Sequence, residues 1–106
     1  MKTYNKLVRD KIPQIIETSG KSCDVKVLNE EEYEAALKKK MQEELNEFLE
    51  AKDKNEQIHE LADLLEVIYS FAHNQGTTIE ELENIRKNKQ DGRGGFGEKI
   101  MLLTVQ

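Results

Sequence analysis

The sequence predicts an all-α protein, built as an antiparallel helical bundle in a single domain over residues 1–106. Three stretches place apolar residues at helical spacing, at about residues 30–52, 56–74 and 78–89. Short polar or glycine-containing segments separate them, and neither a repeat nor a proline-rich linker interrupts the chain. A length of 106 residues suits one compact domain.

A short helix is expected first, directly after Asp10, whose side chain can cap the opening turn. Pro13 is tolerated in that turn because the first amides of a helix have no intrahelical partner. Ser19 and Gly20 should end the helix. Its apolar side consists of Ile12, Ile15 and Ile16.

The helix expected at about residues 30–52 has a single apolar stripe. Its members recur every third or fourth residue, and they are Leu37, Met41, Leu45, Phe48 and Leu49. The linker KDKN that follows is short and polar, which favours an antiparallel neighbour. That neighbour should span about residues 56–74 and stop at Gln75 and Gly76.

The last helix is expected to begin at Thr78, which forms a capping-box pattern with Glu81, and to run through about Lys89. Two β-branched stretches flank the helical part of the chain, at residues 23–28 and 99–105. The sequence therefore leaves open a short β-ribbon made by these two stretches beside the helices.

Composition suggests a modest core. Hydrophobic residues make up 37% of the chain and aromatic residues 6%. Wide apolar helix faces with few aromatics would be better buried against a second copy, so we expect a homodimer or a higher homo-oligomer. Cys23 is the only cysteine, which excludes an intrachain disulfide and a multi-cysteine metal site.

Hydropathy and charge limit the classes of partner and the cellular location that we expect. No apolar run approaches the roughly 20 residues that span a bilayer, and the opening residues are polar, so we expect a cytoplasmic protein without a membrane partner. Residues 30–66 carry 13 acidic and 5 basic residues, a net charge of −8. Residues 1–11 and 84–99 each carry a net +3, but these basic segments are short, so nucleic acid is not an expected partner.

Four carboxylates stand out by their angular position on the two long helices. With each residue turning about 100°, Glu44 borders the apolar stripe of its helix and Glu47 lies about 60° further round. On the next helix Glu60 falls between apolar residues, and Asp63 lies about 60° away. Pairs spaced i, i+3 on adjacent antiparallel helices can converge on one point. A carboxylate on an apolar face needs a compensating cation or hydrogen-bond donors.

Oxygen ligands suit a hard cation, so these residues predict a Mg²⁺ site that Mn²⁺ could also fill. The predicted ligands are Glu44, Glu47, Glu60 and Asp63. The competing interpretation is that glutamate-rich helices produce such spacings by chance.

The four carboxylates lie in two short motifs, EExxE from Glu43 to Glu47 and ExxD from Glu60 to Asp63. This pair of motifs resembles the pattern of the MazG-like all-α nucleoside triphosphate pyrophosphohydrolases. The opening YNKLVRDKIPQII and the closing KNKQDGRGGFGEKIML are similar to a small house-cleaning subgroup of that superfamily. The resemblance implies a helical domain that uses Mg²⁺ to cleave a nucleoside triphosphate, noncanonical or deoxy, to a monophosphate and pyrophosphate. It also implies that the four carboxylates are both metal ligands and catalytic residues.

Hydrolysis of a polyphosphate also needs cations that hold the departing pyrophosphate. Basic residues of the opening and closing blocks are candidates for this substrate-binding role, namely Lys6, Arg9, Lys87, Lys89 and Arg93. Gly94 and Gly95 would let backbone amides approach an anion. The alternative for each basic residue is a surface ion pair, which is the commoner use of such residues.

Two other functions stay open from the sequence. A phosphoribosyl-ATP pyrophosphohydrolase, from a related branch of the same superfamily, would use the same ligands on a different nucleotide. A non-catalytic helical module would bind a nucleotide or a protein without hydrolysis. The presence of all four presumptive ligands favours an enzyme over the module.

Overall fold

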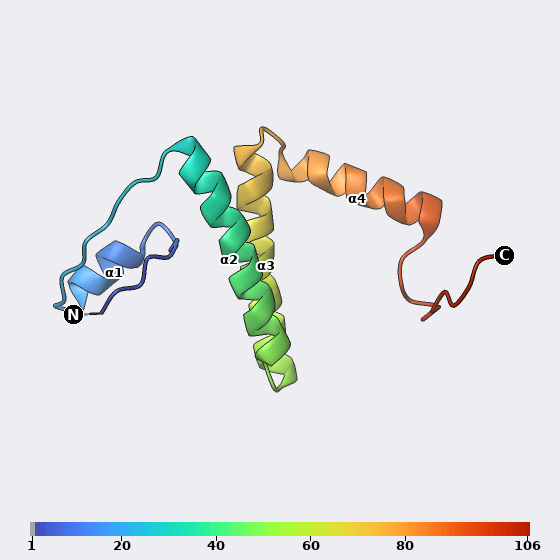
Figure 1. Ribbon diagram of the computed structural model, residues 1–106, viewed down its shortest axis with the longest axis horizontal. Helices are drawn as coiled ribbons and strands as arrows, with labels where there is room; N and C mark the ends of the chain where they lie inside the picture. Colours follow the sequence, from blue (N-terminus) through green and yellow to red (C-terminus); the bar gives the residue numbers. More distant parts are fainter. Residues whose placement is uncertain (1) are drawn as a thin grey trace.

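A hairpin of two long helices forms the centre of the molecule. The computed structural model describes residues 2–106, and in this range the chain forms four helices and no strand. They are α1 (Ile12–Thr18), α2 (Glu30–Glu50), α3 (Lys54–Asn74) and α4 (Ile79–Arg93). Figure 1 shows α2 and α3 packed side by side, with α1 on one side of this hairpin and α4 on the other. The prediction of an all-α protein is therefore confirmed.

Side-chain caps fix the start of α2 and the start of α3. The Asn29 side chain accepts from the Glu32 amide at 2.8 Å, and the Glu32 carboxylate accepts from the Asn29 amide at 3.1 Å, a reciprocal capping box. The Asp53 side chain caps α3 by accepting from the Glu56 amide at 2.8 Å. Residues 51–53 are thus the whole connection, too short for anything but an antiparallel turn.

The hairpin buries little of the chain. Leu37 of α2 and Val67 of α3 are the buried apolar residues in the described range, at 2% and 8% exposure. They lie 15 residues before and after Lys52, which places them at one level along the antiparallel pair. Glu44 and Glu60 lie eight residues before and after Lys52, which places them at one level nearer the linker.

The short helix α1 begins differently from the sequence expectation. Asp10 was expected to cap it, but the N-cap residue is Lys11, and no side chain caps the helix. Lys11 has the near-helical angles φ −89° and ψ −3°, whereas a side chain reaches the first-turn amides from an extended N-cap residue. A turn precedes the helix instead, in which the Ile12 amide donates to the Arg9 carbonyl at 3.0 Å.

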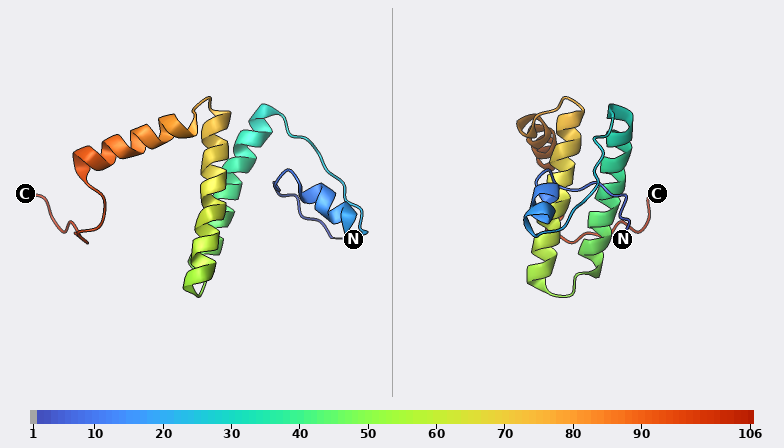
Figure 2. Two further views of the ribbon diagram at one scale, coloured as in Figure 1. Left: turned by 180° about the vertical axis from the view of Figure 1, so that it is seen from behind. Right: turned by 90° about the vertical axis from the view of Figure 1, so that its left-hand side faces the viewer.

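The last helix is longer than predicted and leaves the hairpin. Thr78 caps α4 as expected, accepting from the Glu81 amide at 3.0 Å, but the helix runs to Arg93 rather than Lys89. It ends where Gly94 takes φ +86°, a conformation that favours glycine. Both views in Figure 2 show α4 departing from the end of α3 that is opposite the linker.

The prediction of a β-ribbon from residues 23–28 and 99–105 is wrong. Residues 23–28 and 99–105 have no regular secondary structure within the described range. The first segment leads from α1 into α2, and the second follows α4, so the central hairpin lies between them (Figure 1). Strands are stabilised by pairing, and neither segment has the other within reach.

No helix in residues 2–106 is long and apolar enough to span a bilayer.

Candidate metal centre

Three glutamates from the two central helices converge on one point. Ligand oxygens of Glu44 and Glu47 on α2 and of Glu60 on α3 all lie within 4.8 Å of one another. The i, i+3 spacing puts the two α2 residues on neighbouring positions of one face, and the antiparallel turn brings Glu60 to the level of Glu44. We call Glu44, Glu47 and Glu60 the glutamate cluster.

The glutamate cluster holds carboxylate oxygens that no protein group satisfies. Glu44 is buried, at 7% exposure, and the Oε2 atoms of Glu44 and Glu60 are both inaccessible and lack a hydrogen-bond partner. A buried oxygen without a partner costs roughly 1–3 kcal/mol, and more when it is charged. Two such oxygens in one cluster indicate a role beyond packing.

Electrostatic repulsion adds to that cost. Burial raises the pKa of Glu44 above its ordinary value, and the neighbouring Glu47 carboxylate raises it further. Lys40 acts in the opposite direction, with its Nζ 3.4 Å from Glu44 and 3.5 Å from Glu43. Lys40 is half-buried and lies one helical turn before Glu44, and it was not among the predicted site residues. Its i, i+4 spacing to Glu44 was the available signal.

The donor set fits a divalent cation. The cluster offers only carboxylate oxygens, which are the ligands of hard cations, and its two unpartnered oxygens would gain the partner that they lack. A single lysine beside three carboxylates leaves a negative net charge at the cluster. A bound dication would neutralise it.

Asp63, the fourth predicted ligand, is not part of the glutamate cluster. It lies one turn beyond Glu60 on α3, where its Oδ1 accepts a hydrogen bond from Arg9 Nη2 at 2.9 Å. The pair is solvent-exposed and joins the N-terminal segment to α3 across 54 residues of sequence. Two residues that the sequence assigned to different tasks, one to metal and one to phosphate, are therefore direct neighbours.

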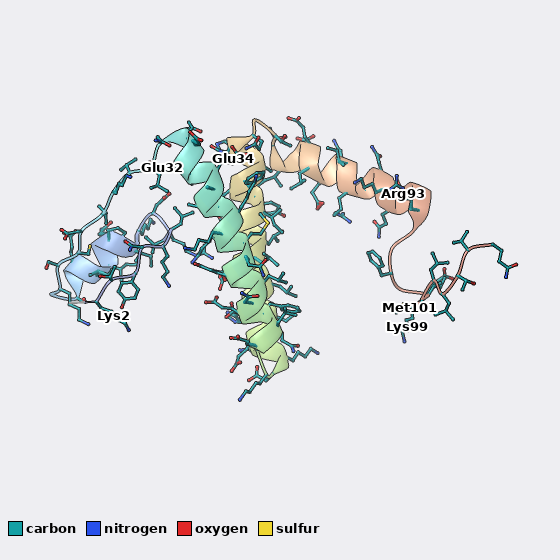
Figure 3. All side chains as sticks on the ribbon, in the orientation of Figure 1. Lys2, Glu32, Glu34, Arg93, Lys99 and Met101 are labelled. Atoms are coloured by element: carbon teal, nitrogen blue, oxygen red, sulfur yellow. The ribbon has the colours of Figure 1, made fainter. Side chains whose placement is uncertain are left out.

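The other basic candidates form no ion pair with the glutamate cluster among the described residues. Lys6 lies in the N-terminal segment with its Nζ 5.8 Å from the centre of the Tyr4 ring. Lys87, Lys89 and Arg93 are exposed on the second half of α4. Figure 3 labels Arg93 at the end of α4 that points away from the hairpin. We call Lys87, Lys89 and Arg93 the basic end of α4.

Comparison with known proteins gives the family. The sequence model of the phosphoribosyl-ATP pyrophosphohydrolase family matches residues 3–90, which include α1, α2, α3 and most of α4. An uncharacterized protein of Mycolicibacterium smegmatis is 45% identical over 42 residues, 40% of this chain and 43% of that protein. The chain thus covers less than half the length of this curated relative. No solved structure matches it significantly. A match over residues 3–90, together with an all-helical fold that holds the glutamate cluster, shows that the chain belongs to the phosphoribosyl-ATP pyrophosphohydrolase family.

Proposed function

We propose that this chain hydrolyses nucleoside triphosphates, noncanonical or deoxy, to a nucleoside monophosphate and pyrophosphate. One observation carries the proposal: a family member presents three converging glutamates with two buried, unpartnered oxygens. Such oxygens are costly in a structural role and useful in a metal-dependent one. Mg²⁺ is the proposed cofactor, and Mn²⁺ is the proposed substitute.

The glutamate cluster would hold the metal, with Asp63 at its edge as a fourth carboxylate. When bound, the ion would neutralise phosphate charge and lower the pKa of a nearby water. Water adds to phosphorus as the anhydride oxygen leaves on pyrophosphate, and one proton is released. Glu47 is the exposed member of the cluster, so its carboxylate is best placed to accept that proton.

Arg9 would bind a phosphate oxygen. Asp63 accepts a hydrogen bond from one guanidinium nitrogen of Arg9, Nη2, and a guanidinium has five N–H donors. The ion pair therefore orients Arg9 next to the glutamate cluster and leaves donors free for the substrate.

Arg9→Ala is expected to raise KM for the nucleotide about tenfold, because one charge-assisted hydrogen bond contributes roughly 1.5 kcal/mol. The change in stability should be small, since exposed ion pairs contribute about 0–1 kcal/mol. Steady-state kinetics and thermal unfolding measure the two effects. Lys26→Ala is a matched control: Lys26 also joins the N-terminal part of the chain to a long helix, through Glu32 at 2.8 Å, with similar exposure. Equal KM values for the two variants would exclude the assigned role of Arg9.

The second candidate function is hydrolysis of phosphoribosyl-ATP, which is the activity that names the family. The proposed ligands and the chemistry at the anhydride would be the same. The two candidates differ in the nucleoside part of the substrate, so direct assay separates them.

The decisive experiment measures pyrophosphate release from a panel of ribo-, deoxyribo- and modified nucleoside triphosphates and from phosphoribosyl-ATP, with Mg²⁺, with Mn²⁺ and with a chelator. We expect release that requires the metal and is fastest with a noncanonical or deoxy triphosphate. Preference for phosphoribosyl-ATP would select the second candidate. No release from any nucleotide would leave a non-catalytic binding module.

A further inference from the structure

One ion pair ties the N-terminal segment, residues 2–11, to the central hairpin. Among the described residues, no hydrogen bond or ion pair other than that between Arg9 and Asp63 joins residues 2–21 to α2 or α3. Helix α1 packs against none of the other helices in this range, and Figure 1 shows it apart from α2 and α3. The polar docking of the N-terminal segment therefore depends on Asp63.

Asp63 lies within reach of a second partner. It follows Glu60 by three residues on α3, which places it about 4.5 Å further along the helix axis and about 60° round it. Its side chain is 41% exposed, and its oxygens lie outside the glutamate cluster. Rotation of that side chain toward Glu60 would add a fourth carboxylate to the glutamate cluster, and it would withdraw Oδ1 from Arg9.

A divalent cation would outcompete Arg9 for this carboxylate. At equal distance a dication attracts a carboxylate about twice as strongly as a guanidinium does. Mg²⁺ also binds oxygen at about 2.1 Å, closer than the 2.9 Å between Arg9 Nη2 and Asp63 Oδ1. An exposed ion pair changes an equilibrium constant by at most about fivefold, so its loss is a small cost. The guanidinium and the cation would, in addition, repel each other across one carboxylate.

We propose that Asp63 exchanges partners. Without metal it holds Arg9 and keeps the N-terminal segment on α3. When a divalent metal binds, Asp63 turns to the glutamate cluster as its fourth carboxylate, and Arg9 is released. Arg9 then pairs with a phosphate oxygen instead, with its charge no longer offset by Asp63. Metal binding therefore raises the affinity of Arg9 for phosphate. This inference rests on the proposed function, because it assigns the order in which that same site is assembled.

A double-mutant cycle on metal binding tests the exchange without nucleotide. Calorimetric titration with Mn²⁺ gives the Kd of the wild type, of Arg9→Ala, of Asp63→Asn and of the double variant. Arg9→Ala removes the competitor for Asp63, so its Kd for Mn²⁺ should fall about threefold. Asp63→Asn should raise the Kd, because it removes the fourth carboxylate. In that background Arg9→Ala should change the Kd no further.

Lys26→Ala is the control for the loss of a basic residue. Lys26 also belongs to the N-terminal part of the chain, but its partner Glu32 is not a predicted metal ligand. This variant should keep the wild-type Kd for Mn²⁺. An equal fall in Kd on Arg9→Ala with Asp63 and with Asn at that position would mean that Arg9 merely repels the metal, and it would overturn the exchange. An unchanged or higher Kd in Arg9→Ala alone would overturn it as well.

The side-chain NMR signals of arginine follow the ion pair directly. The chain has three arginines, and the N–H signal of Arg9 Nε is assigned by its loss in Arg9→Lys. Saturating Mg²⁺ should shift this signal to its position in metal-free Asp63→Asn, where the ion pair is absent. Arg86, which pairs with Glu83 on α4, is the internal reference and should not move. An Arg9 signal that stays in place while calorimetry shows the metal bound contradicts the exchange.

Neither measurement requires turnover, so the exchange and the proposed function can fail separately. A wild type that gives the expected cycle but releases no pyrophosphate from any nucleotide would retain the exchange and refute the proposed function. Metal-dependent release of pyrophosphate, with additive effects of the two substitutions on the Kd, would do the reverse. Absence of both Mg²⁺ and Mn²⁺ binding by the wild type would overturn both.

Discussion

Glu60→Gln is expected to lower pyrophosphate release by about 10³-fold, the largest effect of any single substitution in this chain. Glutamine keeps the size and shape of the side chain but removes the charge. Glu60 is the α3 contribution to the glutamate cluster, and its Oε2 atom is buried without a partner. Loss of this charge leaves the proposed metal with the two α2 carboxylates and Asp63 at the edge of the cluster, and weakens both metal binding and charge neutralisation in the transition state.

The measurement is the rate of pyrophosphate release at saturating Mg²⁺, accompanied by calorimetric titration with Mn²⁺. Glu50→Gln is the matched control, because Glu50 is an exposed glutamate at the end of α2 and outside the cluster. Thermal unfolding in chelator shows whether each variant is folded. Wild-type activity in a folded Glu60→Gln variant would exclude the assigned metal site.

Glu44→Gln is expected to stabilise the metal-free protein while it removes activity. Glu44 is buried beside Glu47, and burial is the main cause of its raised pKa. Removal of the charge should increase the free energy of unfolding in chelator by about 1 kcal/mol at neutral pH. Pyrophosphate release should fall at least about 10²-fold. In excess Mg²⁺ the wild type should become more stable than Glu44→Gln, because the metal would bind the folded wild type more tightly than the folded variant.

The raised pKa of Glu44 also predicts how the free energy of unfolding changes with pH. Because the pKa of Glu44 is raised on folding, the folded protein binds more protons than the unfolded one between the ordinary glutamate value of 4.5 and the raised value. The free energy of unfolding of the metal-free wild type should therefore fall as the pH rises through this interval. Glu44→Gln lacks this contribution, so its advantage should grow as the pH rises from about 4.5 through the raised pKa of Glu44.

Urea denaturation in chelator at several pH values measures this difference. Glu50→Gln again serves as the control, because Glu50 is exposed and lies outside the glutamate cluster. An advantage of Glu44→Gln that stays constant with pH would contradict the assigned cause.

The helices and the position of the glutamate cluster could be read from the sequence because both depend on local geometry. Helical periodicity fixes the face on which Glu44 and Glu60 lie, and the short linker fixes the antiparallel pairing that joins them. Asn29 and Thr78 set the helix starts by bonds to residues three positions away. The ligand roles of the four carboxylates and the single-domain organisation remain predictions.

Only the tertiary structure decided the features that depend on distant segments. The contact between Arg9 and Asp63 joins residues 54 positions apart, and no periodicity relates them. The same reason explains the wrong β-ribbon: residues 23–28 and 99–105 have suitable side chains for strands, but α2 and α3 lie between them. The direction of α4 follows from the turn after α3, and it leaves the basic end away from the glutamate cluster. The sequence thus determined which residues share a helix face, and the three-dimensional path of the chain decided which of those faces meet, because such contacts join segments that no local pattern links.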